Sequence, residues 1–291
     1  VEPGEILVLM GLSGSGKSTL LRAVNGLNPV ARGKVVVADG DRQVDVTNAD
    51  AKTLRHIRLT QIAMVFQQFG LLPWRTVRDN VGLGLELGGM AKPERSAKVE
   101  RQLELVGLSD WADRKVGDLS GGMQQRVGLA RAFVTDAPIL LMDEPFSALD
   151  PLIRTRLQDE LLELQKRLNR TIVFVSHDLD EAFKLGDKIA IMEGGRIVQW
   201  GTPRDIYTEP ANSYVADFVR HMNPLGVLCA RDVMEPADDR ATGEIAPDDR
   251  IHDVIQSVLD SGVPVAVVEN GAAIGQISQK SVLARFLGDT T

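Results

Sequence analysis

A glycine-rich octapeptide near the start of the chain constrains the fold more than any other feature of the sequence. Residues 11–18 read Gly-Leu-Ser-Gly-Ser-Gly-Lys-Ser and match the pattern G-x-x-x-x-G-K-[ST] in full. The largely apolar run Glu5–Met10 precedes them, and a helical pattern from Lys17 to Gly26 follows. A buried strand that enters a glycine loop and then a helix presents backbone N–H groups and the positive end of a helix dipole to phosphate. The sequence therefore predicts a phosphate-binding loop.

Side chains in this loop add to its backbone donors. We expect Lys17 to lie near the β- and γ-phosphates of a nucleotide and Ser18 to offer its hydroxyl to Mg²⁺. A chance glycine-rich turn is the alternative, but the flanking strand and helix argue against it. The predicted nucleotide-binding residues of the loop are Gly11, Ser13, Gly14, Ser15, Gly16, Lys17, Ser18 and Thr19.

Strand and helix patterns alternate along much of the chain. This alternation favours an α/β core with a parallel sheet covered on both faces. Further strands are predicted at Val35–Val37, Ile62–Phe66, Ile139–Met142 and Thr171–Ser176. A long amphipathic helix is predicted at Pro151–Leu168, and a β-hairpin at Asp187–Trp200 turning at Gly194-Gly195.

Residues from about 71 to 118 interrupt this alternation. Val77–Leu87 and Glu94–Val106 have helical periodicity, and Pro93 suits the start of the second helix. We therefore expect a helical insertion within the α/β core.

Two acidic residues follow the predicted strand Ile139–Met142. Their position at the carboxyl end of the strand places Asp143 and Glu144 at the ligand-binding edge of a parallel sheet. We expect Asp143 to hold Mg²⁺, directly or through water, and Glu144 to polarise the attacking water as general base. An acidic exit from a surface strand is the alternative, and the phosphate-binding loop weakens it.

A second helix start also has phosphate-binding character. In Leu119–Gln125, Ser120 is a good N-cap, and Gly121 and Gly122 leave backbone N–H groups accessible. Plain helix capping would usually explain a lone Ser-Gly-Gly.

Three other polar residues flank predicted elements. Gln67 follows Ile62–Phe66 and could reach Mg²⁺ and the water, although a lone glutamine is most often a solvated surface residue. His177 follows the strand ending at Ser176 and could bond the γ-phosphate, although a lone histidine is usually structural. Asp150 could equally be the N-cap of the helix that begins at Pro151.

Together, in this order and spacing, these features resemble the ATP-binding cassette (ABC) family from the start of the chain to about residue 220. Gly11–Ser18 resembles its Walker A loop, Gln67 its Q-loop, Leu119–Gln125 its signature, Ile139–Glu144 its Walker B strand, Ser147–Asp150 its D-loop and His177 its switch histidine. The resemblance implies a P-loop NTPase fold with ATP and Mg²⁺ as cofactors. It implies Ser18, Gln67 and Asp143 near the metal, and Glu144, His177 and Gln67 in catalysis.

The family also implies a head-to-tail homodimer. Each ATP would lie between the Walker A loop of one copy and Ser120, Gly121 and Gly122 of the other, with Asp150 nearby. The two phosphate-binding helix starts of one chain would then serve two different ATP molecules.

The segment Leu72–Val81 and the tripeptide Gly11-Leu12-Ser13 resemble the ATPases of quaternary amine importers, which carry glycine betaine, choline or proline-type osmolytes. The resemblance implies peripheral attachment to permease subunits at the cytoplasmic face of the bacterial inner membrane. A substrate-binding protein would act with the chain only indirectly. The alternatives are an importer for another solute, a soluble ABC ATPase acting on DNA or ribosomes, and a regulatory protein without ATPase work.

A second, α+β unit is expected after about Pro224. A helix at Ile251–Leu259, strands at Val263–Val268 and Ile274–Ile277, and a closing helix at Ser281–Leu287 resemble a single CBS module spanning residues 225–291, with Glu235–Asp249 as a loop. Regulation by ionic strength or a nucleotide and a degenerate dimerisation cap are both open interpretations.

The resemblance predicts that the ATPase domain, residues 1–224, is incomplete at its N-terminus. Only ten residues precede Gly11 and none is aromatic, whereas family members stack adenine on an aromatic residue there. Such a stack is worth about 1–3 kcal/mol.

Composition excludes several classes of function. A formal net charge of −7 over 291 residues does not suggest a general nucleic-acid binder. The single cysteine, Cys229, cannot form an internal disulfide and suits a reducing compartment. No apolar run approaches the roughly 20 residues of a transmembrane helix.

Overall fold

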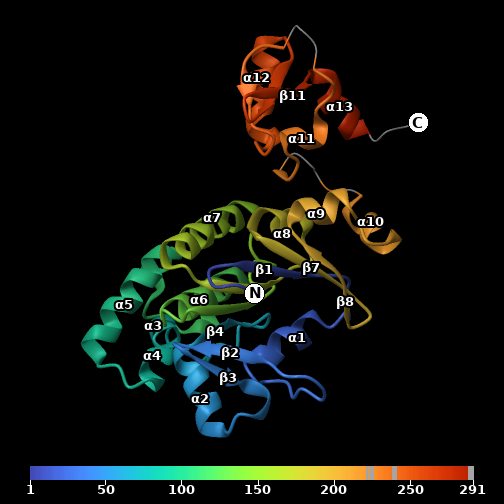
Figure 1. Cartoon of the computed structure of the whole chain (residues 1–291). Helices are drawn as coiled ribbons and strands as arrows, with labels where there is room; N and C mark the ends of the chain where they lie inside the picture. Colours follow the sequence, from blue (N-terminus) through green and yellow to red (C-terminus); the bar gives the residue numbers. More distant parts are fainter. Residues whose placement is uncertain (221, 223–225, 238–240, 288–291) are drawn as a thin grey trace. The chain divides into compact units, whose positions relative to one another are not determined.

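The computed structural model describes residues 1–220, 222, 226–237 and 241–287. The chain forms two compact units, one of Val1–Asp178 with Leu185–Trp200 and the other of Leu179–Lys184 with Gly201–Thr291 (Figure 1). The predicted boundary at residues 224 and 225 lies outside the described residues.

The first unit is built on a six-stranded sheet. Its order is β4 (Ile62–Val65), β5 (Ile139–Asp143), β6 (Thr171–Val175), β1 (Ile6–Met10), β7 (Lys188–Glu193) and β8 (Arg196–Gly201). The pairs β4–β5, β5–β6, β6–β1 and β1–β7 are all parallel, which confirms the predicted parallel core. The predicted hairpin is also present, and Gly194 and Gly195 supply its turn with φ of 54° and 79°.

Alternation along the strands gives this sheet two buried faces. Leu9, Leu141 and Val173 face a core that includes Leu21 of helix α1 (Lys17–Val24). Their strand neighbours are buried as well, which is typical of a parallel sheet covered on both sides. Figure 1 shows α1 and helix α7 (Pro151–Leu168) on opposite sides of the sheet.

A small antiparallel hairpin and a helix belong to the same core as α1. Strands β2 (Val36–Asp39) and β3 (Arg42–Asp45) pair with each other, a 3₁₀ turn follows, and helix α2 (Ala51–Thr60) contributes the buried side chain of Ile57. The sequence predicted only one strand here and no helix. Most residues of α2 are exposed, and only Ile57 is buried. Asp50 caps the helix by accepting from the N–H of Thr53 at 2.7 Å.

The predicted helical insertion is confirmed, with one change. It contains α3 (Val77–Val81), α4 (Leu83–Leu87), α5 (Lys92–Leu105) and two 3₁₀ turns, Ser109–Trp111 and Val116–Asp118. The single helix predicted over Val77–Leu87 is wrong, because it is interrupted at Gly82. Glycine is a poor helix former, and at this position it lets Val99 of α5 approach closely.

Helix α6 (Gly121–Phe133) follows the helical insertion in the first unit. Ser120 caps it, accepting from the N–H of Met123 at 3.4 Å.

The second unit is a small α+β structure. It contains α8 (Leu179–Leu185), α9 (Pro203–Thr208), α10 (Ser213–Val219), α11 (Ala230–Val233), β9 (Glu244–Ile245), α12 (Ile251–Ser261), β10 (Val265–Glu269), β11 (Ala272–Ile277) and α13 (Gln279–Leu287). Strand β10 pairs with β11 antiparallel and with β9 parallel. Asn270 and Gly271, both with positive φ, form the turn between β10 and β11, whereas β9 lies in the predicted loop.

The core of this unit also reaches helix α9. Tyr207 packs against a cluster that includes Val233 and Ile251, and Arg204 makes two hydrogen bonds through Nε to the carboxylate of Asp232, at 2.8 and 3.1 Å. Helix α9, which precedes the predicted boundary, is therefore tied to α11 beyond it.

Within the part of the chain that the structure describes, no helix combines the length and apolar character needed to cross a membrane.

The junction of β1 and the phosphate loop yields a stability prediction. A Cβ on Gly11 would lie 2.2 Å from the carbonyl oxygen of Met192 on β7, and Gly11 has φ of 142°. Gly14→Ala is the matched control, since Gly14 has φ of 82° but no atom within 4 Å of such a Cβ. We expect Gly14→Ala to destabilise the fold by about 1–2 kcal/mol and Gly11→Ala by clearly more. Thermal unfolding of both variants measures this, and equal losses would contradict it.

Candidate nucleotide-binding and hydrolysis site

The predicted site residues meet at one edge of the six-stranded sheet. Strands β1, β4, β5 and β6 run in parallel, so their carboxyl ends deliver Gly11, Gln67, Asp143 and His177 to the same edge. A cavity of about 460 Å³ lies there. It is lined by Ser13, Gly14, Gly16, Lys17, Ser18, Thr19, Gln67, Glu144 and His177.

The phosphate loop is shaped by glycine. Gly14 and Gly16 adopt φ of 82° and 95°, a region that other residues rarely enter, and Gly16 is the N-cap of α1. Ser15 is buried in the loop, and its hydroxyl has no hydrogen-bond partner among the described residues. An oxygen-rich anion seated on this loop would suit both the helix terminus and the unpaired hydroxyl.

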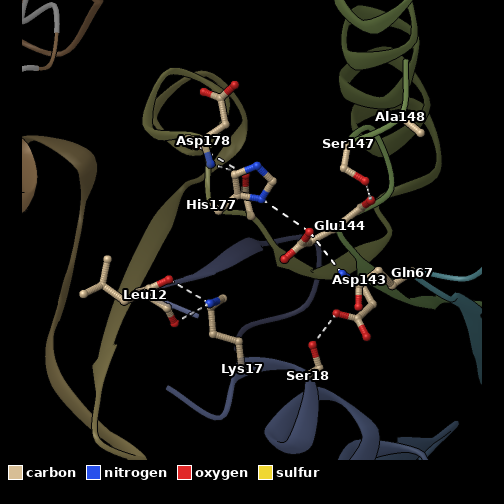
Figure 2. Close-up of polar contacts among 12 residues, drawn as sticks. Leu12, Lys17, Ser18, Gln67, Asp143, Glu144, Ser147, Ala148, His177 and Asp178 are labelled. Carbon is tan, nitrogen blue, oxygen red and sulfur yellow. Dashed lines mark hydrogen bonds and ion pairs between the residues drawn. The ribbon is translucent and has the colours of Figure 1, made fainter. Parts of the chain in front are cut away.

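Lys17 is the first residue of α1, and its ammonium contacts the backbone of the loop. Its Nζ donates to the carbonyl oxygens of Gly11 at 2.7 Å and Leu12 at 3.1 Å (Figure 2). Burial lowers the pKa of Lys17, while the nearby charges of Glu144 and Asp143 oppose that shift. The two carboxylates therefore do not fully compensate the burial of the ammonium, and a polyphosphate would supply further negative charge.

Ser18 and Asp143, which were both predicted to lie near Mg²⁺, contact each other directly. The Ser18 hydroxyl donates to Oδ1 of Asp143 at 2.7 Å, and Asp143 is fully buried at the end of β5. No cluster of three or more His, Cys, Asp or Glu side chains is present among the described residues. Mg²⁺ requires none, because it is commonly bound by one or two carboxylates together with substrate phosphates. One hydroxyl, one carboxylate and the amide oxygen of Gln67 fit such an ion.

Glu144 occupies the centre of the cluster. Its Oε2 lies 3.4 Å from Nε2 of Gln67 and 3.3 Å from Nδ1 of His177 (Figure 2). Its backbone is in the left-handed region, with φ of 50°, which is uncommon for a residue other than glycine. A carboxylate held between an amide and an imidazole, facing a phosphate-binding loop, can accept a proton from water.

The predicted contacts to the opposite ATP do not line this cavity. Ser120, Gly121 and Asp150 are exposed, and Gly122 is half-buried. Asp150 caps α7 by accepting from the N–H of Ile153 at 3.0 Å, so the capping alternative is confirmed for this residue. Their contact with a nucleotide stays a prediction.

Two residues at the site were missed from the sequence. Arg22 donates from one guanidinium nitrogen to Oδ2 of Asp143 at 3.1 Å. Gln125 is fully buried on α6, where its amide donates to the carbonyl oxygen of Glu144 at 3.5 Å and accepts from the N–H of Ala148 at 3.2 Å. The only sequence signal for Arg22 is its spacing of four residues from Ser18, which places both on one face of α1.

Comparisons with known proteins agree with this geometry. A family model described as ABC transporter matches residues 1–147. The glycine betaine/proline betaine transport system ATP-binding protein ProV of Salmonella typhimurium is 53% identical over 233 residues, covering 80% of this chain and 57% of its own length. The chain therefore spans a little over half the length of this relative.

A second relative matches nearly the whole chain. The trimethylamine N-oxide transport system ATP-binding protein TmoW of Ruegeria pomeroyi is 43% identical over 287 residues, covering 97% of this chain and 82% of its own length. Among solved structures, the dimeric post-hydrolysis state of the ATP-binding cassette MJ0796 bound to ADP and Pi has a TM-score of 0.66 and 34% identity, covering 70% of this chain and 88% of that one. The site geometry, the family model and these relatives together show that the chain belongs to the ABC transporter family.

Proposed function

We propose that this chain is the ATP-hydrolysing subunit of an importer for quaternary amines and related methylated osmolytes. The observation that carries the proposal is the meeting of Lys17, Ser18, Gln67, Glu144 and His177 around one cavity. The transport systems named for its relatives, for glycine betaine, proline betaine and trimethylamine N-oxide, support the substrate class.

In this proposal the phosphate loop holds the triphosphate of ATP. Lys17 exchanges its contacts with the loop carbonyls for phosphate oxygens, and the N–H groups at the start of α1 bind the same oxygens. Ser18, Asp143 and Gln67 hold Mg²⁺, which when bound neutralises charge on the phosphates.

Hydrolysis then depends on the residues around Glu144. A water attacks the γ-phosphorus, the bond to the β-phosphate oxygen breaks, and the Glu144 carboxylate accepts the proton of the water. His177 and Gln67, which both contact Oε2 of Glu144, orient this carboxylate and the γ-phosphate.

We propose that two copies of the chain enclose two ATP molecules. Ser120 and Gly121 lie exposed at the start of α6 and outside the cavity of their own chain, which leaves this helix terminus open to the nucleotide of a second copy. Gly122 and Asp150 would lie against the same nucleotide. The dimer reported for MJ0796 supports this arrangement.

Transmembrane permease subunits are the proposed membrane partner, with the chain at the cytoplasmic face and a substrate-binding protein acting indirectly. A partly apolar groove of about 300 Å³ offers a docking place; its lining includes Met64, Phe66, Leu83, Leu87 and Arg131.

The loop of residues 72–76, at the start of the helical insertion, is a second proposed contact with the permease. The fully buried Asn80 exchanges two hydrogen bonds with Leu72 and donates to the carbonyl of Thr76. This preformed loop displays Trp74, which is 69% exposed.

Residues 225–291 are proposed to be a single CBS-like module that regulates transport, with a dimerisation cap as the alternative. Their helix–strand–strand–helix order, α12–β10–β11–α13, supports the proposal.

Glu144→Gln tests the hydrolytic role. We expect ATP binding to persist and turnover to fall on the order of 10²–10⁴-fold, because the amide cannot accept the proton of the water. Steady-state phosphate release and nucleotide binding measure the two properties. Near-normal phosphate release would refute the assignment of the base.

Uptake assays test the solute. Cells that lack this subunit should lose accumulation of labelled glycine betaine, proline betaine, choline or trimethylamine N-oxide, and the chain should restore it. Complementation with Glu144→Gln is the matched control and should fail. Restored uptake of an amino acid or an anion, but of none of these four, would point to the rival importer class.

Ionic strength tests the regulatory role. Transport by the full chain should change with ionic strength, and transport by a chain lacking residues 225–291 should not. The same response in both chains would favour the dimerisation cap.

A further inference from the structure

Helix α1 holds the buried Asp143 carboxylate from two successive turns. Ser18 and Arg22 are four residues apart and so lie on one face of the helix. The Ser18 hydroxyl binds Oδ1 at 2.7 Å, and the Arg22 guanidinium binds Oδ2 at 3.1 Å. Each carboxylate oxygen therefore has its own partner from α1.

Asp143 depends on these two partners because its side chain is fully buried. Its side chain has no solvent exposure, whereas that of Arg22 is 39% exposed. A carboxylate that is fully withdrawn from water is costly unless it is paired and hydrogen-bonded, unlike an exposed ion pair, which contributes little. Lys17 lies close enough to interact with Asp143 electrostatically, but it donates hydrogen bonds to the loop carbonyls of Gly11 and Leu12.

Arg22 also faces a second cavity beside the nucleotide site. A space of about 670 Å³ is lined by Arg22, Leu27, Asn28 and residues from the Phe66–Gly70 segment. Gln67 lines both this space and the nucleotide cavity. Arg22 thus contacts Asp143 and lines the same cavity as the Gln67 segment. Its Nε–H is buried with no hydrogen-bond partner among the described residues.

The hydrogen bonds of the two Asp143 oxygens are therefore expected to respond differently when a metal binds. Ser18 and Oδ1 form the hydroxyl–carboxylate pair that suits Mg²⁺, so their mutual hydrogen bond must yield to it. The contact between Arg22 and Oδ2 lies on the other side of the carboxylate and need not change.

We propose that Arg22 is a positioning residue that acts as the fixed counter-ion of Asp143. It retains Oδ2 while Oδ1 and the Ser18 hydroxyl change partners on binding of Mg²⁺ and ATP. The part of this inference that concerns Mg²⁺ rests on the proposed function, whereas the counter-ion role does not.

A double-mutant cycle without nucleotide or metal tests the counter-ion role. Arg22→Met should lower the thermal unfolding midpoint by about 5 °C in the chain that retains Asp143. In the Asp143→Asn background, where no buried charge needs compensation, the same change should cost about 1 °C or less. Arg55→Met on α2, an exposed position, is the matched control for loss of one arginine. Equal losses in both backgrounds, or no loss in either, would overturn the proposal.

Metal binding tests the positioning role separately. With ATP saturating, the affinity for Mn²⁺, followed by electron paramagnetic resonance, should fall about tenfold in Arg22→Met. Arg22→Lys keeps the charge and should restore part of that affinity. Unchanged or tighter Mn²⁺ binding in Arg22→Met would overturn the positioning role. If the proposed hydrolytic function were wrong instead, the stability cycle would still show the coupling of Arg22 to Asp143.

Discussion

The parallel register of β1, β6 and β5 is the constraint on which the site depends. Leu9 and Asp143 are both paired with Val175, so the three strands end at one level of the sheet. That alignment brings the phosphate loop, the acidic pair and the histidine loop within a few ångströms, although more than 160 residues separate the first from the last. A shift of one residue in the β5–β6 pairing would turn Asp143 to the opposite face.

Local sequence was sufficient to predict the features that depend only on neighbouring residues. Gly11–Ser18, the strand ending at Met142 and the cap at Ser120 could each be predicted because apolar runs, glycines and caps act within a few residues. The helix α2 and the break at Gly82 could not, since α2 buries only Ile57 and Gly82 lies inside a helical pattern. Likewise, Glu144 was predicted to be the base, but its contacts with Gln67 and His177 depend on strand order.

Residues that act across the fold left almost no sequence signal. Arg22 reads as an ordinary arginine on an amphipathic helix, and its value depends on the burial of Asp143, 121 residues away. Gln125 lies in the signature segment, yet its amide binds the two ends of the turn from Glu144 to Ala148. A left-handed backbone at Glu144 persists only where its surroundings impose it. Three hydrogen bonds hold this backbone in place. Gln125 and the hydroxyl of Ser147 both donate to the carbonyl oxygen of Glu144, and the N–H of Glu144 donates to the carbonyl oxygen of Val175.

Each charged group of the site thus has a partner within the protein, and a ligand must replace the partners of Lys17 and of Oδ1 of Asp143. Lys17 is bound to loop carbonyls, Asp143 to Ser18 and Arg22, and Glu144 to Gln67 and His177. Binding is favoured only where the new contacts are stronger than the ones they replace, so a ligand must satisfy Lys17 and the Ser18–Asp143 pair together. A triphosphate with a divalent cation does so, because it supplies anionic oxygens for Lys17 and a hard cation for Ser18 and Asp143. A ligand that offered phosphate alone would satisfy Lys17 but would leave the bond between Ser18 and Asp143 in place.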